Sequence, residues 1–269
     1  MFGAEMGGWD RAHDVAEAAG EDLYVDPDSG YRVFTRGGLL RRGVCCGSGC
    51  RHCPYDRKGQ RSPQPRWRAS VSPRGCEVDV LSWSGGKDSY LAWLDLRAQA
   101  KRPTVLLTTH DADSELIAHQ DLHAQVIEAQ AQALRADLIT VPLHPSVSYD
   151  AAITLALDMV AARHRVRRLV FGDLHLQEIR QWREDTFGAW LEARQASLHF
   201  PLWHANPTDL LRRLEASGAT ATLSATPAGW GRVGQRFDAD FVASLPPQVD
   251  PFGENGEFHT RIDLTSCGP

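Results

Sequence analysis

The chain has 269 residues and no apolar run close to the roughly 18 residues that a membrane-crossing helix needs. Residues 1–26 are acidic, so the basic and then apolar start of a signal peptide is missing as well. A hydrophobic share of 42% and a charged share of 23% exclude a chain that is disordered throughout. There is no internal repeat. We therefore expect a soluble, cytoplasmic protein with no membrane partner, long enough for one large domain or two smaller ones.

Acidic residues are nearly missing from one segment. Residues 32–74 contain ten arginines and Lys58 but only one acid, Asp56, which gives a formal charge of +10 (11 minus 1). Because the whole chain carries −5, the remainder carries −15. A basic segment on an acidic protein indicates either a polyanionic partner such as RNA or a solvated, arginine-rich linker. The sequence leaves both interpretations open.

The cysteines are few, six in all, and four of them lie within nine residues: Cys45, Cys46, Cys50 and Cys53. In a chain without a secretory signal, such a cluster indicates metal binding before disulfides. Four thiolates suit Zn²⁺ or an iron–sulfur cluster, with His52 as an alternative ligand, although reduced structural thiols are the competing interpretation. Cys76 stands alone before the first predicted strand, so we expect it at the amino edge of the sheet.

Short apolar runs alternate with amphipathic stretches after residue 76. The runs predict buried parallel strands at residues 78–83, 104–109, 137–143 and 167–173. The stretches between them predict helices at residues 88–100, 117–135, 149–165 and 176–196. This alternation predicts an α/β protein with a doubly wound parallel sheet that binds ligands at the carboxyl ends of its strands.

The rest of the chain is less regular. Residues 57–75 hold three prolines and little periodicity, which predicts a linker or extended arm. Near the C-terminus we expect a helix capped by Thr208 and ended by Gly218, followed by a strand-like run over residues 219–231. The predicted domains are therefore residues 1–75, a Cys-rich module with a basic linker; 76–203, the parallel sheet; and 204–269, a smaller domain.

The strongest chemical signal is the run SGGKDS, residues 84–89, directly after a predicted strand and at the start of a predicted helix. Two glycines let backbone N–H groups turn toward an anion, and the helix presents its positive end to the same anion. Lys87 adds a charge, the flanking serines add hydroxyl groups, and Asp88 is placed to hold Mg²⁺ or orient the loop. The spacing of a Walker loop is absent.

This run resembles the PP-loop of the ATP pyrophosphatase superfamily, which binds pyrophosphate. The segments VFGDLHLQEIRQWRE (170–184), PLW (201–203) and DPFGENGEFHT (250–260) are similar, in order and spacing, to the diphthine–ammonia ligase (diphthamide synthase) family. The resemblance implies a PP-loop domain of Rossmann-like HUP type and a C-terminal α/β substrate domain. It also implies ATP with Mg²⁺, adenylation of a small-molecule carboxylate, and attack by ammonia that leaves an amide, AMP and pyrophosphate. Residues 31–56 are similar to the oxidoreductase-like N-terminal domain family.

The motifs and the resemblance together point to particular residues. The expected ATP-binding residues are Ser84, Gly85, Gly86, Lys87, Asp88, Ser89, Thr108 and Gly172. The expected catalytic residues are Lys87, Asp88, Asp173, Glu257 and His259. The expected substrate-binding residues are Gly253, Glu254, Asn255, Gly256, Glu257, His259 and Thr260. Two alternatives stay open: Asp173 as the N-cap of the helix that follows it, and the 253–260 stretch as a plain polar surface loop.

The chain departs from the family at the predicted substrate loop. Asn255 and His259 stand where the family typically has Gly and Glu, so we expect a carboxylate other than diphthine. His259 suits proton transfer from ammonium, because an imidazole titrates near neutrality. The rival functions are an RNA-modifying PP-loop enzyme guided by the basic segment, and an adenine-nucleotide-binding protein without turnover. His119 and His123, four apart on a predicted helix, form either a metal-binding pair or part of a solvated face.

Overall fold

The contacts of the computed structural model divide the chain into two compact units. Unit 1 comprises residues 1–64 and 143–151, and unit 2 comprises residues 65–142 and 152–269. The structure describes residues 8–42, 50–54, 64–99, 101–118, 120–145 and 147–264. Within these ranges no helix is both long enough and apolar enough to cross a membrane.

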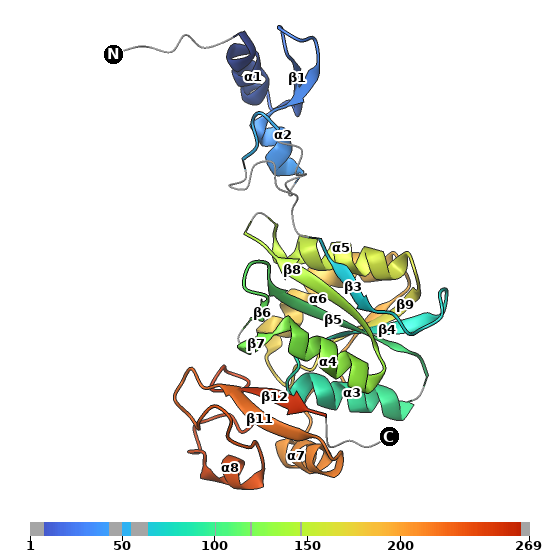
Figure 1. Cartoon of the computed structure of the whole chain (residues 1–269), viewed down its shortest axis with the longest axis vertical. Coiled ribbons are helices and arrows are strands. Elements are labelled where there is room, and N and C mark those ends of the chain that lie inside the picture. The colour runs from blue at the N-terminus through green and yellow to red at the C-terminus, as the bar shows by residue number, and fades with distance from the viewer. Residues whose placement is uncertain are drawn as a thin grey trace. The chain divides into compact units, whose positions relative to one another are not determined.

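Unit 1 is a small helix-and-hairpin fold (Figure 1). Its elements are α1 (Gly8–Ala18), the antiparallel strands β1 (Leu23–Val25) and β2 (Arg32–Phe34), and α2 (Arg36–Arg41). Thr35 caps α2, because its hydroxyl accepts a hydrogen bond from the Gly38 amide at 3.0 Å. The rings of His13 and His52 stack with 3.8 Å between centroids, and Tyr24 Oη lies 2.8 Å from His52 Nε2. These ring contacts join the segment around His52 to α1 and the hairpin.

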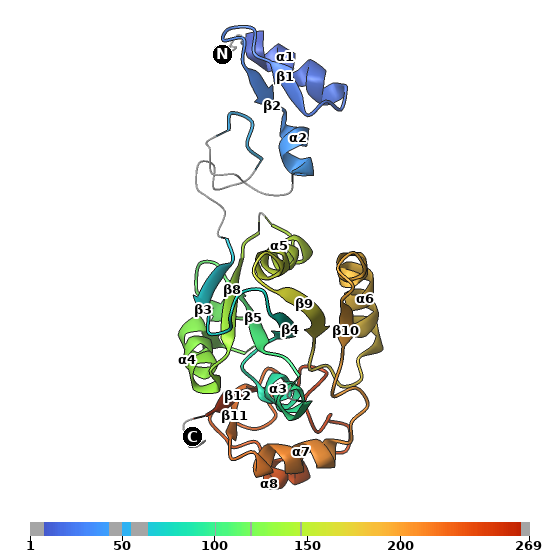
Figure 2. The ribbon, with the colours of Figure 1, turned by 90° about the vertical axis from the view of Figure 1, so that its right-hand side faces the viewer.

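Unit 2 is built on a six-stranded sheet with the order β10-β9-β4-β5-β8-β3 and helices on both faces (Figures 1 and 2). The strands are β3 (Arg66–Ala69), β4 (Glu77–Ser82), β5 (Thr104–Asp111), β8 (Asp137–Leu143), β9 (Arg165–Val170) and β10 (Ser197–His199). Neighbours from β10 through β9 and β4 to β5 run parallel, whereas β3 runs antiparallel to β8. The predicted α/β class with a mostly parallel sheet is confirmed.

The helices of the sheet region are α3 (Lys87–Gln99), α4 (Ala124–Leu134), α5 (Tyr149–Ala161) and α6 (Gln177–Glu192). The prediction of one helix over 117–135 was wrong at its start, because a small hairpin of β6 (Leu116–Ile117) and β7 (Leu122–His123) precedes α4. His123 is the N-cap of α4, and its Nδ1 accepts a hydrogen bond from the Gln125 amide at 3.3 Å. It therefore does not lie on a helix face, and His119 lies outside the described residues.

Part of the predicted linker is also structured. Arg66 to Ala69 form β3, whose backbone pairs with Leu138, Ile139 and Thr140 of β8. The prolines that suggested a linker, Pro65 and Pro73, flank this strand, where the missing N–H costs no ladder hydrogen bond.

The C-terminal part of unit 2 contains α7 (Pro207–Ala216), α8 (Ala239–Ser244) and an antiparallel pair of β11 (Thr220–Ala225) and β12 (His259–Asp263). The cap of α7 is Asn206, whose side chain accepts a hydrogen bond from the Thr208 amide at 2.8 Å, so the assignment of the cap to Thr208 was wrong. Proline at the first helical position explains the shift, since its lost N–H has no intrahelical partner there. Leu223 and Ile262 of this part share one buried core with Leu81 and Leu106 of the large sheet.

A buried ion cluster joins β4 and β9 to the turn that precedes β5. Asp79 of β4 is 1% exposed and accepts hydrogen bonds from Arg168 at 2.6 and 2.9 Å and from Arg102 at 3.0 Å. We expect Asp79→Ala to lower the free energy of unfolding by about 3–5 kcal/mol, because it leaves two partly buried guanidinium groups without their counter-ion. Urea titration measures the loss.

The matched control is Asp209→Ala, which breaks an exposed ion pair with Arg212 on α7. That change is expected to cost no more than about 0.5 kcal/mol. Equal losses of unfolding free energy at the two positions would show that the buried ion cluster stabilises the protein no more than an exposed ion pair does.

Candidate nucleotide site

The SGGKDS loop joins the carboxyl end of β4 to the N-terminus of α3, as predicted. Gly85 has a φ of +80°, and a Cβ at this position would lie 2.5 Å from Cδ1 of Ile127. A Cβ on Gly86 would lie 2.9 Å from the carbonyl oxygen of Thr260. Both positions therefore require glycine, Gly85 for its left-handed backbone as well as for space.

The loop is held from the far end of the chain. The Gly85 carbonyl accepts hydrogen bonds from the Ile262 amide at 2.9 Å and from Gln130 Nε2 at 3.1 Å. Gln130 is buried, donates also to the Ile262 carbonyl at 2.8 Å, and accepts from the Trp83 indole at 2.9 Å. The sequence analysis missed Gln130, and its only signal was a polar residue beside Ile127 on the apolar side of a helix.

Side-chain hydroxyl groups accept the hydrogen bonds of two backbone amides in the loop. The Lys87 amide donates to Thr260 Oγ1 at 3.0 Å, and the Gly86 amide donates to Ser84 Oγ at 3.3 Å. Ser89 Oγ in turn donates to the Gly86 carbonyl at 2.9 Å. A phosphate oxygen is a stronger acceptor than a hydroxyl, so these two amides at a helix N-terminus fit a phosphate that displaces the hydroxyl groups.

Lys87 is the buried cation of the site, with 2% of its surface exposed. Its Nζ lies 2.9 Å from Asp88 Oδ2 and 5.4, 5.1 and 5.7 Å from the ring centroids of Phe237, Phe252 and Phe258. The three aromatic faces stabilise the ammonium at this buried position. The charge is therefore held in place by residues that lie 150 or more positions further along the chain.

Three carboxyl groups lie close to this lysine. Burial raises the pKa of Asp88, against the attraction of Lys87, and Asp88 Oδ1 is buried without a hydrogen-bond partner among the described residues. Burial, and then the negative charge of Asp88, raises the pKa of Glu254 to about 7. Glu254 Oε2 accepts a hydrogen bond from the Leu174 amide at 3.1 Å. A carboxyl that titrates near neutrality beside a phosphate-type loop is suited to proton transfer.

Asp173 is the third carboxyl, and its charge is balanced by Arg183, which donates two hydrogen bonds at 2.7 and 3.0 Å. The N-cap of α6 is Leu176, and no side chain caps this helix. The alternative that Asp173 is a helix cap is therefore wrong. Gly172 packs against the same helix start as the loop, because a Cβ there would lie 2.8 Å from the Asp88 carbonyl oxygen.

A cavity of about 480 Å³ opens beside the loop. Of the predicted site residues, it is lined by Lys87, Asp88, Gly253, Glu254, Gly256, His259 and Thr260. The lining residues that the sequence analysis missed are Gln120, Ile179, Pro227 and Phe258. Its volume is within the range of small-ligand and cofactor sites, and its lining includes an ammonium group and two carboxyl groups. Gln120 Oε1 is a further buried acceptor without a partner among the described residues.

Other predicted residues have structural partners instead. Glu257 accepts hydrogen bonds from the amides of Asp250 at 3.1 Å and Asn255 at 3.0 Å and from the Asn255 side chain at 3.2 Å. Burial alone would raise the pKa of Glu257, but these hydrogen bonds outweigh it and lower the pKa. Glu257 thus orders the loop that carries Glu254. Thr108 donates its hydroxyl hydrogen bond to the Trp83 carbonyl at 2.7 Å, which ties the second parallel strand to the start of the phosphate loop.

The predicted metal residues are described only in part. Cys45 and Cys46 lie outside the described residues. The Cys53 amide donates to the Cys50 carbonyl at 3.2 Å, so this pair closes a turn. Within the described ranges, no group of three or more His, Cys, Asp or Glu side chains is arranged to hold a metal ion.

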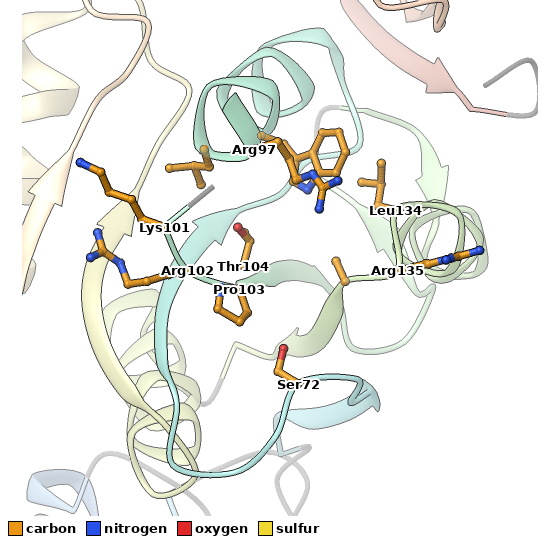
Figure 3. A pocket seen from close by; sticks show the side chains of 11 residues that line it. Ser72, Arg97, Lys101, Arg102, Pro103, Thr104, Leu134 and Arg135 are labelled. Atoms are coloured by element: carbon orange, nitrogen blue, oxygen red, sulfur yellow. The ribbon is translucent and has the colours of Figure 1, made fainter. Parts of the chain in front are cut away.

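A second hollow, of about 460 Å³, lies at the opposite, amino edge of the sheet (Figure 3). In Figure 3, Arg97 and the hydroxyl groups of Ser72 and Thr104 face the hollow, while Lys101 and Arg135 extend outward. The C-terminal ends of α3 and α4 border this hollow. Basic residues there offset the negative ends of two helix dipoles, so the hollow has an explanation without a ligand.

The fold is that of an α/β protein with a mostly parallel sheet and a glycine-containing loop between β4 and the N-terminus of α3. A model of a family of unknown function, DUF5522, matches residues 12–59. The chain is also similar to the crystal structure of a predicted subunit of tRNA methyltransferase from Methanocaldococcus jannaschii DSM, at 17% sequence identity and a TM-score of 0.38. That match covers 69% of this chain and 95% of the other.

The tight packing of the loop gives a second prediction. Gly85→Ala combines a left-handed backbone with a Cβ in contact with Ile127, so we expect it to lower the free energy of unfolding by about 3 kcal/mol or more. We also expect ATP to raise the melting temperature of the unchanged protein, and Gly85→Ala to lose this rise. Thermal and urea unfolding with and without ATP provide both readings.

Gly229→Ala is the matched control, since Gly229 has a φ of +77° but nothing within 4 Å of its Cβ position. It is expected to cost about 1–2 kcal/mol and to keep the ATP response. An ATP response that survives in Gly85→Ala would contradict the assignment of this loop to phosphate binding.

Proposed function

We propose that this protein is an ATP-dependent ligase that forms AMP and pyrophosphate, activates a carboxylate as its adenylate and amidates it with ammonia. The observation that carries the proposal is the buried ammonium of Lys87 beside a glycine loop at a helix N-terminus, in a cavity shared with Glu254. The loop supplies N–H donors and a positive charge, which stabilise a departing pyrophosphate. The Glu254 carboxyl supplies a base, which an amine nucleophile needs to lose its proton.

The first half of the reaction depends on charge neutralisation. In this proposal the amides of Gly86 and Lys87 and the Lys87 ammonium bind the β- and γ-phosphates, while the carboxylate of the substrate attacks the α-phosphorus. Asp88 Oδ1, a buried acceptor without a partner among the described residues, fits a Mg²⁺ ligand. Bound Mg²⁺ would supply further neutralisation of the phosphates. No protein nucleophile is required.

The second half of the reaction needs a proton acceptor. Ammonium must lose a proton before its nitrogen attacks the acyl adenylate, and Glu254, with a pKa of about 7, can take that proton at neutral pH. AMP then leaves as the amide forms. His259, at the start of β12 and on the wall of the same cavity, is the second candidate for proton transfer.

The cavity also limits the substrate. Ile179, Pro227 and Phe258 give part of its wall an apolar character, and its lining includes no arginine among the residues that the structure describes. A carboxylate carried on a partly apolar small molecule fits this lining better than a multiply charged one.

The test is AMP release from ATP with Mg²⁺ and ammonium, with either a small-metabolite extract or a total RNA fraction added. Stimulation by the metabolite extract, with ¹⁵N from labelled ammonium in an amide product, is the expected result. Stimulation by RNA alone would overturn the small-molecule proposal in favour of an RNA-modifying enzyme. Absence of AMP with both fractions, while ATP still binds, would indicate a nucleotide-binding protein without turnover.

A further inference from the structure

The amino edge of the sheet holds a cysteine–histidine pair that the proposed site does not use. Cys76 directly precedes β4, and its Sγ lies 3.3 Å from Nδ1 of His164. Two backbone hydrogen bonds fix the pair on either side: Gly75 donates to the Arg163 carbonyl at 2.8 Å, and Arg165 donates to the Cys76 carbonyl at 2.9 Å. The thiol and the imidazole are thus held in contact by the sheet itself.

His164 is the buried member of the pair. It is 4% exposed, and its Nε2 has no hydrogen-bond partner among the described residues. The Trp67 ring packs against the imidazole with 6.1 Å between centroids. Burial lowers the pKa of His164, so the ring is neutral at neutral pH and carries a lone pair on one nitrogen. A neutral imidazole in hydrogen-bond contact with a thiol is the arrangement of a base with its nucleophile.

Charged side chains surround the His164 imidazole. The positive charges of Arg163 and Arg74 both act on His164, and Asp137 acts on it in the opposite sense. The Asp137 carboxylate is already engaged, since it accepts hydrogen bonds from the amides of Val71 at 2.7 Å and Ser72 at 3.3 Å. Cys76 is partly exposed. Partly exposed thiols in positive surroundings are the reactive ones in proteins.

We propose that Cys76 is a nucleophilic thiol, activated by His164, whose reactants are hydroperoxides. The thiol proton moves to His164 while the sulfur attacks the terminal oxygen of the peroxide. The O–O bond breaks, and the proton returns to the leaving oxygen. The products are a sulfenic acid on Cys76 and one alcohol, or water when the peroxide is hydrogen peroxide; sulfur is oxidised by two electrons and the peroxide is reduced by two.

The test measures the reaction of Cys76 in the full chain with iodoacetamide, and with hydrogen peroxide followed by a sulfenic-acid trap, by mass spectrometry of the Cys76 peptide. At about pH 7 we expect folded Cys76 to react about tenfold faster than the same cysteine in urea. His164→Gln is expected to remove this advantage at about pH 7, and to react as fast as the unchanged protein at about pH 10, where ordinary thiols are ionised without a base. Cys76→Ser is expected to leave ATP-dependent AMP release unchanged, which separates this proposal from the ligase proposal.

Two results would overturn the proposal. One is a folded-state rate no higher than the rate in urea, which needs no variant and therefore does not depend on whether His164→Gln folds. The other is a His164→Gln protein that keeps both the melting temperature and the reactivity of the unchanged chain, because the imidazole would then have no part in activating the thiol.

Discussion

Lys87→Met is expected to lower ATP-dependent AMP release by about 100- to 1,000-fold, the usual loss when a preorganised charge on a developing anion is removed. Lys87 places its ammonium, 2% exposed, in a box of aromatic rings beside the loop amides. Methionine keeps the volume of the aliphatic stem inside this box but carries no charge. The variant therefore separates loss of charge from loss of packing. Initial rates of AMP formation at saturating ATP measure the effect.

The matched control is Lys101→Met, the same change at an exposed lysine of the opposite sheet edge. Its rate is expected to stay within about twofold of the unchanged protein, in line with the small effects of most surface substitutions. A Lys87→Met enzyme with nearly full activity and an unchanged affinity for ATP would contradict a role of this loop in ATP binding and catalysis.

Glu254 has the second largest expected effect, through its raised pKa of about 7. A base acts in its ionised form, so AMP release in the presence of ammonium is expected to rise with pH and level off above about pH 7. Glu254→Gln is expected to lower the rate of AMP release by about 100-fold or more, since the amide accepts no proton. The rate of this variant is also expected not to rise with pH. His259→Gln, which removes the imidazole from the same cavity, is expected to leave the inflection in place.

The raised pKa of Glu254 is also expected to make the stability of the protein depend on pH. Because the folded state disfavours ionised Glu254, the free energy of unfolding is expected to fall as pH rises from about 4.5, the ordinary value, to about 7. Glu254→Gln should lack this fall. A pH–rate profile of Glu254→Gln that superimposes on that of the unchanged protein would rule out the carboxyl as the base.

Much of the fold follows from local patterns in the sequence. The strands β4, β5 and β8 are mainly apolar and mostly buried, and β9 ends in the apolar pair Leu169 and Val170. Strands of this kind are typical of a parallel sheet that is covered on both faces. The loop at Gly85 was predictable for a similar reason, because two glycines between a buried strand and a helix leave few conformations other than a tight turn toward the helix N-terminus.

The rest depends on contacts between distant segments. The hairpin before α4 has strands of two residues each, too short for any periodicity to register. Phe237, Phe252 and Phe258 lie around the Lys87 ammonium although they come from the other end of the chain. No spacing in the sequence predicts these contacts. The partners of Glu257 likewise became apparent only in the folded loop, where it accepts backbone hydrogen bonds rather than lining the cavity.

The central claim is that the SGGKDS loop holds the pyrophosphate end of ATP. Calorimetric titration of the full chain with inorganic pyrophosphate, alone and in the presence of ATP, tests it most directly and needs no knowledge of the substrate. The account predicts that pyrophosphate binds, that saturating ATP abolishes this binding, and that Lys87→Met weakens both ligands while Lys101→Met weakens neither. Undiminished pyrophosphate binding in saturating ATP, or equal binding to all three proteins, would contradict it.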